Sequence, residues 1–373
     1  MKKIVLIRSN QIQGDSRVEK YLRFFSAQSL DYEVLAWDRD DTGIDLDRVK
    51  FYRRNSGYAV GGMTAALNRL YWFLYVIRML RQYKKQEIVI HACDVDCAYP
   101  AALYKKFFNR HAYIVFDVFD WMSDDVASKS KGMISKSIAY MESISLKYSN
   151  KLIVCEEERR EQIPDYEKYD IMVLPNIPTA DSMTKMIDEN ECKFGDDKPV
   201  FSYVGGLGYA RFLDELLTLA EEGYVNLLIA GYGDKQMEDR CKKLNERDNV
   251  KYFGKVPYSI GLSIMSHSDL IYAMYCKIIR NHYYAAPNKF YEPMMLGKPL
   301  LTTKDIIIGE KVEKLGFGYT IGESYQELVD FVKSIDKVDL RRKGEVAHLL
   351  WIQKYRNYTY DFLKNQYLPL LKG

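Results

Sequence analysis

The stretch AAPNKFYEPMMLGKPLLTT, residues 285–303, carries the most specific chemical pattern in the sequence. Pro287 and Asn288 precede an amphipathic turn of helix. Lys289 and Glu292 stand on that turn, three positions apart. The first N–H groups of a helix lack partners within it and carry a partial positive charge, so they are a natural seat for phosphate. A carboxylate about one turn further along could accept two sugar hydroxyls. The pattern predicts a nucleotide site, and the alternative is a solvated carboxylate that favours the helix dipole.

Acidic and imidazole side chains follow two apolar runs in the first half of the chain. IHACDVD contains His91 and Asp94, and FDVFDW contains Asp117 and Asp120. If both runs are parallel strands, their carboxyl ends lie at the same edge of a sheet, where ligands bind in α/β folds. We expect these side chains to serve a substrate there. The alternatives are hydrogen bonding within a turn and capping of the next helix.

Metal binding is not expected from this sequence. Asp94 and Asp96 have the spacing of an Asp-x-Asp metal motif, but they lie in the first half, far along the chain from the predicted nucleotide helix. The six cysteines include no Cys-x-x-Cys pair, and most lie in or beside apolar runs. That arrangement is typical of reduced, buried thiols in a cytoplasmic protein, and not of a disulfide framework or a zinc site.

Alternating apolar runs and amphipathic helical segments must position these residues. The strands predicted in the first half are residues 3–8, 32–37, 86–92, 112–117 and 151–155. Those predicted in the second half are residues 199–208, 225–233, 249–254, 269–275 and 298–303. Repetition of strand and helix predicts parallel sheets covered on both faces. We therefore predict an α/β fold with two Rossmann-like, doubly wound domains that face a cleft.

The length of 373 residues suits two domains. The strand and helix pattern pauses at residues 171–183, which carry two prolines, and restarts near residue 199. We predict a first domain over residues 1–180 and a second over residues 181–345. Residues 346–373 are predicted to be a C-terminal helix that could cross back to the first domain.

A dinucleotide-binding fingerprint is absent from both halves. The first predicted strand is followed by a single glycine, Gly14, whereas the fingerprint needs three. In the second half, GYGDKQ begins correctly but has Gln236 where the third glycine belongs. A hydride-transfer enzyme is therefore disfavoured. Gly205, Gly206 and Gly208 lie at the end of the predicted strand at residues 199–208, and they indicate either close approach to a ligand or a plain strand-to-helix turn.

Residues 67–85 form a helical segment that is apolar on several faces and flanked by cations. Such a helix is either buried or lies in a membrane interface. Residues 51–150 hold 14 Lys and Arg against 8 Asp and Glu, which favours an anionic membrane surface as a partner. The whole chain has a net charge of only +3, so nucleic acid is not expected as a partner.

The second half resembles a known family of enzymes. FSYVGGLGYARFLDELLTLA, LLIAGYGDKQMEDRCKKLNERDNVKYFGKVPYS and YYAAPNKFYEPMMLGKPLLTT match, in order, the donor domain of retaining GT-B glycosyltransferases. The resemblance is to the family-4-like group that builds bacterial surface polysaccharides. GDSRVEKYLRFFSAQ, IHACDVD, FDVFDW and VLPNIP are similar to pieces of the acceptor domain, so the resemblance covers most of the chain.

The resemblance implies roles for the residues around the donor helix. Glu292 would bind the ribose hydroxyls, and the backbone at Pro287, Asn288 and Lys289 would face the diphosphate. The family has two glutamates eight positions apart, but Tyr284 stands at the first position here. This difference leaves the residue that contacts the transferred sugar open.

The glycine loop also departs from the family pattern, which has a basic residue directly after the first glycine. Gly205 is followed here by Gly206, and Arg211 approximates the second basic position of the family. Arg211 would be the main diphosphate clamp, because a guanidinium can pair with two phosphate oxygens at once. The backbone would recognise the base around Gly231, Gly233 and Val256.

On the acceptor side, the family often has a histidine near the scissile bond, where this chain has Phe119. Asp117 or Asp120 would then orient the acceptor hydroxyl, and His91 or Asp94 would contact the acceptor. Fixed cations and helix N-termini can neutralise the departing diphosphate, so we expect neither a metal nor another cofactor.

Together these patterns predict a glycosyltransferase that moves a sugar from a nucleoside-diphosphate sugar, with UDP or GDP as the nucleotide, to a glycan or polyprenyl-linked acceptor. The resemblance implies retention of configuration and a role in capsule, exopolysaccharide or lipopolysaccharide synthesis. We expect a cytoplasmic protein, with peripheral attachment to the inner face of the plasma membrane through residues 67–85. The alternatives are a non-catalytic nucleotide-sugar-binding subunit and a nucleotide-sugar epimerase of the same fold.

Overall fold

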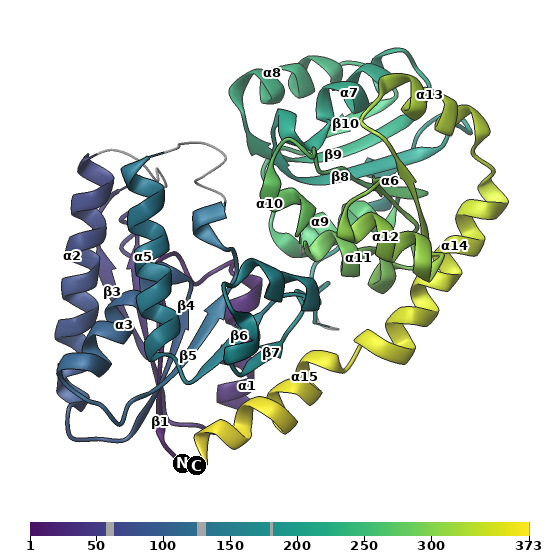
Figure 1. The fold of residues 1–373 in the computed structure, drawn as a ribbon. Helices are drawn as coiled ribbons and strands as arrows, with labels where there is room; N and C mark the ends of the chain where they lie inside the picture. The colour runs from purple at the N-terminus through teal and green to yellow at the C-terminus, as the bar shows by residue number, and fades with distance from the viewer. Residues whose placement is uncertain (57–62, 125–131, 180–181, 286, 373) are drawn as a thin grey trace. The chain divides into compact units, whose positions relative to one another are not determined.

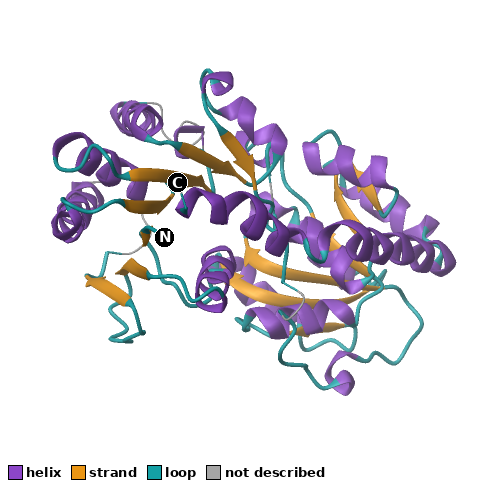
Figure 2. Ribbon diagram, turned by 90° about the horizontal axis from the view of Figure 1, so that it is seen from below, coloured by secondary structure: helices purple, strands orange, loops and turns teal. Residues whose placement is uncertain are grey.

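The chain folds into two compact units, each built around one parallel sheet (Figure 1). The structure is a computed structural model that describes residues 1–56, 63–124, 132–179, 182–285 and 287–372. Unit 1 comprises Met1–Pro175 and Thr359–Gly373, and unit 2 comprises Asn176–Tyr358. Helices lie on both sides of the strands in each unit (Figure 2). The predicted α/β fold class with two Rossmann-like sheets is confirmed.

The sheet of unit 1 has the strand order β3-β2-β1-β4-β5-β6-β7, and every pair of neighbouring strands is parallel. Its strands are β1 (Lys3–Arg8), β2 (Tyr32–Asp38), β3 (Val49–Arg53), β4 (Ile88–Cys93), β5 (Tyr113–Val118), β6 (Lys151–Val154) and β7 (Ile171–Val173). The order reverses between β1 and β4. In open parallel sheets, ligands bind outside the carboxyl ends of the strands at such a reversal.

Helices cover both faces of this sheet. They are α1 (Ser16–Ala27), α2 (Met63–Leu80), α3 (Val95–Phe107) and α5 (Met133–Tyr148), with short 3₁₀ turns at Arg81–Tyr83, Glu157–Gln162 and Tyr166–Lys168. The apolar faces of α2, α3 and α5 pack on one side of the strands around the buried Trp72. On the other side, Tyr21 of α1 contacts the ring of His91 with 4.3 Å between ring centres. Successive strand residues point to opposite faces, so His91 faces α1.

The C-terminal segment completes unit 1. Its last described parts are α15 (Tyr358–Phe362) and the helical turns Leu363–Tyr367 and Leu368–Leu371. The carbonyl of Leu371 accepts a 3.1 Å hydrogen bond from the N–H of Lys2, and the two ends of the chain lie side by side (Figure 1). The rings of Tyr367 and Phe25 stack with 5.9 Å between centres. The segment therefore fills part of the core beside α1.

The sheet of unit 2 has the order β10-β9-β8-β11-β12-β13, again with all neighbours parallel. Its strands are β8 (Val200–Leu207), β9 (Asn226–Gly233), β10 (Val250–Tyr252), β11 (Leu270–Ala273), β12 (Leu300–Thr303) and β13 (Gly318–Ile321). Its longer helices are α7 (Leu213–Glu221), α8 (Lys235–Leu244), α9 (Tyr258–Ser266), α11 (Asn288–Leu296), α12 (Ile307–Leu315), α13 (Tyr325–Ser334) and α14 (Lys337–Leu350). Short helical turns are α6 (Glu189–Cys192), Tyr209–Arg211, α10 (Arg280–Tyr283) and Trp351–Tyr355. The order reverses between β8 and β11, the counterpart of the reversal in unit 1.

Sequence reasoning missed three short strands, β3, β7 and β13. All three lie at the edge of a sheet. No residue of β3 is buried, whereas β7 and β13 are partly buried but only three and four residues long, too short to stand out as apolar runs. The six cysteines are all buried and free, as predicted. Within the described ranges, no helix has the length and apolar character needed to cross a membrane.

Candidate active site

Lys289 and Glu292 form an ion pair at the start of α11, with 2.6 Å between Nζ of Lys289 and Oε2 of Glu292. Their spacing of three residues places both side chains on one face of the helix. The Glu292 side chain has no exposed surface, whereas that of Lys289 is 18% exposed. The alternative of a solvated carboxylate at Glu292 is therefore wrong, since the helix carries this residue into the interior of unit 2.

The other oxygen of Glu292, Oε1, is buried and has no partner in good hydrogen-bond geometry among the residues described, and the hydroxyl of Tyr258 is the polar group close to this carboxylate. Buried polar atoms in folded proteins almost always have a partner, so such an atom calls for an explanation. Burial raises the pKa of the Tyr258 hydroxyl well above its ordinary value, and the nearby Glu292 carboxylate raises it further. A hydroxyl of a bound sugar could satisfy Oε1 once the Lys289 side chain moves aside.

Arg211 ends the 3₁₀ turn that follows β8, and its guanidinium lies 4.4 Å from the centre of the Tyr275 ring. Its Nη1 atom is buried and finds no hydrogen-bond partner in the described part of the chain. Burial raises the pKa of Tyr275 to about 12, an effect that Arg211 opposes and Glu292 enhances. Tyr275 is thus close enough to Arg211 and Glu292, the two residues predicted to bind the donor, for their charges to affect its pKa. Sequence reasoning missed Tyr275, because it ends the apolar run at residues 269–275 and looks like a core residue.

The first turn of α11 has no side-chain cap among the described residues, and its N-cap residue is Pro287. The helix itself begins at Asn288. Without a side-chain cap, the first N–H groups of α11 can bind an anion. Tyr284 follows the short helix α10 and meets Tyr283 edge to face, with 5.0 Å between ring centres. Tyr284 and Pro287, which precede the first turn of α11, are both partly buried.

The predicted glycines divide into two groups. Gly205 and Gly231 face each other across the extended pair of β8 and β9, and a Cβ on Gly231 would overlap the carbonyl oxygen of Gly205. A Cβ on Gly233 would overlap the carbonyl oxygen of Leu207 in the same way. Gly206 is exposed, and open space surrounds the position of its missing Cβ. Close strand pairing therefore explains Gly231 and Gly233 without a ligand.

Val256 lies between β10 and α9 and is partly exposed. Gln236, which replaces the third glycine of the dinucleotide fingerprint, accepts a 2.9 Å hydrogen bond from the hydroxyl of Tyr209. Asp234 caps α8, because its side chain accepts hydrogen bonds from the N–H groups of Gln236 and Met237. The glycine-rich end of β9 is thus a capped strand-to-helix turn.

In unit 1, Asp94 follows β4 with a φ of 66°, a conformation that residues other than glycine rarely adopt. Its Oδ2 accepts a 2.6 Å hydrogen bond from Nη1 of Arg8, and its Oδ1 accepts one of 3.0 Å from the N–H of Phe119. The Asp94 side chain is 22% exposed. Burial raises the pKa of Asp94 to about 6, although Arg8 opposes the shift. A carboxyl group with that pKa can take or give a proton near neutral pH.

Unlike Asp94, the side chains of Asp117 and His91 are fully buried and have no exposed surface. Asp117 accepts hydrogen bonds of 2.6 Å from Arg17 and 2.9 Å from the hydroxyl of Tyr21. Although burial alone would raise it, the Arg17 guanidinium holds the pKa of Asp117 well below its usual value. Nδ1 of His91 lies 2.9 Å from the hydroxyl of Tyr367. Direct contact of His91 or Asp117 with a substrate does not fit this burial.

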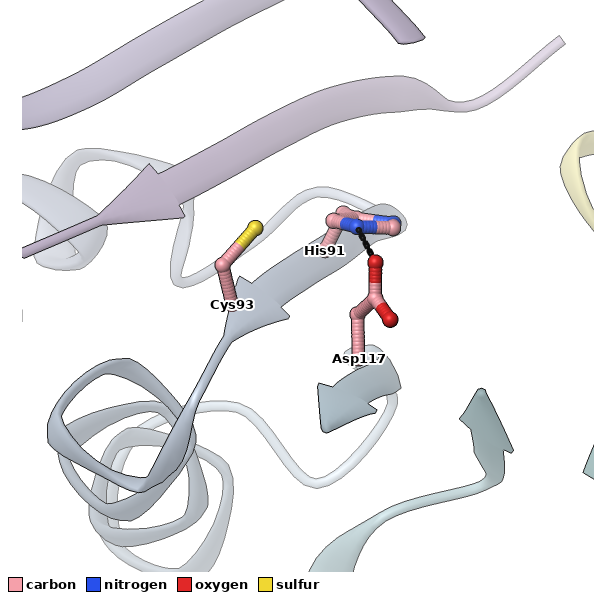
Figure 3. A group of neighbouring side chains, drawn as sticks. All are labelled: His91, Cys93 and Asp117. Carbon is pink, nitrogen blue, oxygen red and sulfur yellow. Dashed lines mark ion pairs between the residues drawn. The ribbon is translucent and has the colours of Figure 1, made fainter. Parts of the chain in front are cut away.

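His91, Cys93 and Asp117 place one possible metal-ligand atom each within 4.8 Å of the others (Figure 3). Nε2 of His91 lies 3.4 Å from Oδ2 of Asp117, and the two side chains come from the neighbouring strands β4 and β5. Asp117 already forms an ion pair with Arg17. Burial raises the pKa of the Cys93 thiol, which favours its protonated form. A cation at this position would have to displace a guanidinium, so the cluster fits a structural network better than a metal centre.

Asp120 lies at the surface, where Oδ1 is 3.2 Å from Nη2 of Arg159. The structure thus brings Asp94, Asp117 and Asp120 to the same sheet edge, where Asp120 is exposed, Asp94 is partly exposed and Asp117 is buried. Sequence reasoning missed the arginines that hold these aspartates. Arg8 ends the predicted strand at residues 3–8 and Arg17 lies in the stretch GDSRVEKYLRFFSAQ, and neither pattern signals an ion pair with a distant residue.

The comparison with family models finds one match. Residues 185–342 match the model described as "Glycosyl transferases group 1". This range contains β8 to β13 and hence the Glu292, Arg211 and Tyr275 group. No curated protein matches the sequence.

Solved structures of similar fold span the full length of the chain. A sucrose-phosphate synthase from Thermosynechococcus elongatus has a TM-score of 0.73 at 14% identity and covers 100% of this chain and 99% of its own. The Anabaena protein HepE, in complex with UDP and glucose, has a TM-score of 0.69 at 13% identity, with 99% and 100% covered. The structure of "Trehalose-6-phosphate from E. coli bound with UDP-2-fluoro glucose" has a TM-score of 0.68 at 11% identity and covers 97% of this chain and 98% of its own. These likenesses confirm the predicted fold over both units.

Proposed function

We propose a donor, an acceptor class and a location for this chain, which is a glycosyltransferase of the GT-B fold with a group 1 glycosyl transferase domain at residues 185–342. The donor is a nucleoside-diphosphate sugar bound in unit 2. The acceptor is a glycan or a lipid-linked saccharide bound in unit 1. The reaction retains the configuration of the sugar and serves the synthesis of a cell-surface polysaccharide.

The observation that carries the donor proposal is that two buried atoms, Nη1 of Arg211 and Oε1 of Glu292, have no hydrogen-bond partner among the described residues. One is a cation that can pair with phosphate, and the other is an acceptor for sugar hydroxyls. In the proposed complex, Arg211 and the N-terminus of α11 bind the diphosphate, Lys289 turns from Glu292 toward it, and Glu292 takes the ribose hydroxyls. These fixed positive charges stabilise the diphosphate as it leaves.

UDP is the favoured nucleotide. HepE holds UDP, and the E. coli structure holds a UDP sugar. GDP remains the second candidate. The base would contact the backbone near Gly231, Gly233 and Val256, where side chains offer little discrimination.

Thermal unfolding with UDP, GDP, ADP, CMP and dTDP tests the donor site. A ligand at about 100 times its dissociation constant adds roughly 2.7 kcal/mol to stability. We expect one diphosphate to raise the Tm of the natural protein and to lose this effect in Glu292→Ala. Equal shifts in both proteins would exclude Glu292 as a ligand.

The reaction class is tested separately from binding. A non-catalytic nucleotide-sugar-binding subunit would bind the donor but would not hydrolyse it slowly in the absence of acceptor, whereas a transferase would. A nucleotide-sugar epimerase would convert the donor into a second sugar nucleotide. Chromatography of the donor after long incubation distinguishes the three.

The surface of α2 supports peripheral attachment to the inner face of the plasma membrane. Leu67, Leu70 and Leu74 are 46%, 51% and 55% exposed on this helix, and Arg78 and Arg81 follow them on the surface. Exposed leucines beside cations suit an anionic lipid surface. Vesicles that contain anionic lipid should retain the protein at low salt and release it at high salt, and a protein that never sediments with them would refute this attachment.

A further inference from the structure

Unit 2 contains a pocket of about 740 Å³ between α14 and the turn that joins α11 to β12. Its volume lies well within the range for small-molecule sites. The helices α11 and α14 pack against each other beside it (Figure 1). A Cβ on Gly344 of α14 would lie only 2.4 Å from the carbonyl oxygen of Gly297. Both glycines line the pocket, so closely packed backbone forms one of its walls.

The pocket lies at the opposite edge of the sheet from the candidate donor site. Asp269 and Pro299 line it, and they directly precede β11 and β12. Tyr275, by contrast, follows the carboxyl end of β11. The first turn of α11 carries Lys289, whereas its last residue, Leu296, lines the pocket. A helix of nine residues is about 13 Å long, so a ligand at each end can be bound at once.

Three cations line this pocket without a partner. Lys298 lies in the turn after α11, and Lys337 and Arg341 lie on successive turns of α14. Within the described residues, none of the three side chains forms a hydrogen bond or an ion pair. Like charges four positions apart on a helix repel each other, and a cation in the first turn opposes the helix dipole. An anion in the pocket would relieve both effects.

Lys298 is partly buried, whereas Lys337 and Arg341 are exposed. Burial lowers the pKa of Lys298, an effect that Asp269 opposes. The carboxylate of Asp269 is held by the backbone, because its Oδ2 accepts a 2.9 Å hydrogen bond from the N–H of Val200. A bound anion would stabilise the charged form of Lys298 more closely than Asp269 does.

The lining also offers acceptor groups and apolar surface. Asp269 and Glu345 each contribute a carboxylate, and Leu296, Leu340 and Leu349 are apolar. Inorganic phosphate alone would leave both carboxylates facing a like charge. A sugar phosphate uses the whole lining, since its phosphate pairs with the cations, its hydroxyls donate to the carboxylates, and its C–H groups contact the leucines.

We propose that this pocket binds a small sugar phosphate, with Lys298 and Arg341 on the phosphate and Asp269 and Glu345 on the hydroxyls. The ligand is an effector and not a substrate, because it lies at the sheet edge opposite the candidate donor site. Its binding does not depend on the nucleotide that the donor carries.

Titration calorimetry of the full chain with glucose 6-phosphate, glucose 1-phosphate and fructose 6-phosphate tests the proposal. Glucose and inorganic phosphate are the partial probes. Lys298→Gln and Arg341→Gln each remove one proposed phosphate partner. Arg342→Gln is the control for Arg341→Gln, because it removes the same charge from the next position of α14, where the side chain is 72% exposed and pairs with Asp339. Lys243→Gln is the control for Lys298→Gln, since Lys243 is exposed on α8 and does not line the pocket.

We expect at least one sugar phosphate to bind the natural protein and both controls alike. It should bind Lys298→Gln and Arg341→Gln at least tenfold more weakly, and glucose and inorganic phosphate should bind the natural protein at least tenfold more weakly. No binding of any of the three sugar phosphates overturns the proposal. Equal affinity for inorganic phosphate also overturns it, because the sugar would have no role. An equal loss in Arg342→Gln does so as well, because only the overall charge would then matter.

The same titration in the presence of saturating UDP separates the pocket from the donor site. We expect the sugar phosphate to remain bound, since the two ligands lie at opposite ends of α11. A sugar phosphate that UDP displaces would lie in the donor site, and the pocket would lose its assignment. If UDP itself does not bind, the proposed donor site fails, whereas the titration without UDP still decides the pocket.

Discussion

The hydroxyl of Tyr367 lies 2.9 Å from Nδ1 of His91 in the core of unit 1. Tyr367 belongs to the C-terminal segment, and His91 belongs to β4, 276 residues earlier in the chain. The other ring nitrogen of His91, Nε2, lies 3.4 Å from Oδ2 of Asp117. Asp117 in turn forms an ion pair with Arg17. A buried polar chain thus ties the end of the sequence to the strand ends of the first sheet.

Replacement of Tyr367 by Phe should lower the free energy of unfolding by about 1–3 kcal/mol, because Nδ1 of His91 would be buried without its partner. The ring would still stack on Phe25, so packing is retained. Urea unfolding measures the change. Tyr360→Phe is the control, since this ring is 49% exposed on the same segment. A loss of the same size in both variants would contradict the role of the hydroxyl.

Lys289→Ala should destabilise the protein by about 3 kcal/mol or more, because it leaves the buried carboxylate of Glu292 without its cation. The double variant Lys289→Ala with Glu292→Gln should recover much of this loss, since the remaining side chain is neutral. Unfolding curves of the single and double variants give the comparison. If the double variant is as unstable as the single one, the carboxylate charge is not the cause.

The pH dependence of the free energy of unfolding should reveal the raised pKa of Asp94 in the folded protein. Its pKa is raised to about 6 by burial, so the folded protein binds this proton more tightly than the unfolded chain does. The contribution is complete below the unfolded pKa of about 4 and is lost as pH rises through about 6. The stability difference between the natural protein and Asp94→Asn should therefore fall, by up to about 3 kcal/mol, across this window. A difference that grows with pH there would refute the assignment.

Arg211→Gln should weaken binding of the nucleoside diphosphate by roughly 10- to 100-fold, as expected when a charge-assisted hydrogen bond of about 1.5–3 kcal/mol is lost. Titration calorimetry with UDP measures the affinity. Arg247→Gln is a suitable control, because it removes the same charge from an exposed position in unit 2. Unchanged affinity in Arg211→Gln would remove this residue from the donor site.

Gly231→Ala should destabilise unit 2 by several kcal/mol, because the new Cβ would overlap the carbonyl oxygen of Gly205 and force β8 and β9 apart. Gly206→Ala should change stability little, since open space surrounds that position. The difference in Tm between the two variants is the measurement. Comparable Tm values would mean that the paired strands shift at little cost.

The sequence predicted most of the strands and the donor helix, because local residue patterns determine these elements. The apolar runs at residues 3–8 and 32–37 appear as β1 and β2, since strands buried on both faces are apolar throughout. The resemblance of residues 201–220, 227–259 and 283–303 to the donor domain of GT-B glycosyltransferases implied the group 1 domain that the comparison finds at residues 185–342. The position of Glu292 in the first turns of a helix followed from spacing alone.

Only the tertiary structure decided what surrounds these residues. Asp94 and Asp117 look equivalent at two strand ends, yet one is partly exposed with a raised pKa and the other is buried against Arg17 with a lowered one. Tyr275 and Tyr367 read as core residues, and their roles depend on partners far away in sequence. Burial and charge pairing arise from residues that meet only when the chain folds, so no local pattern could encode them.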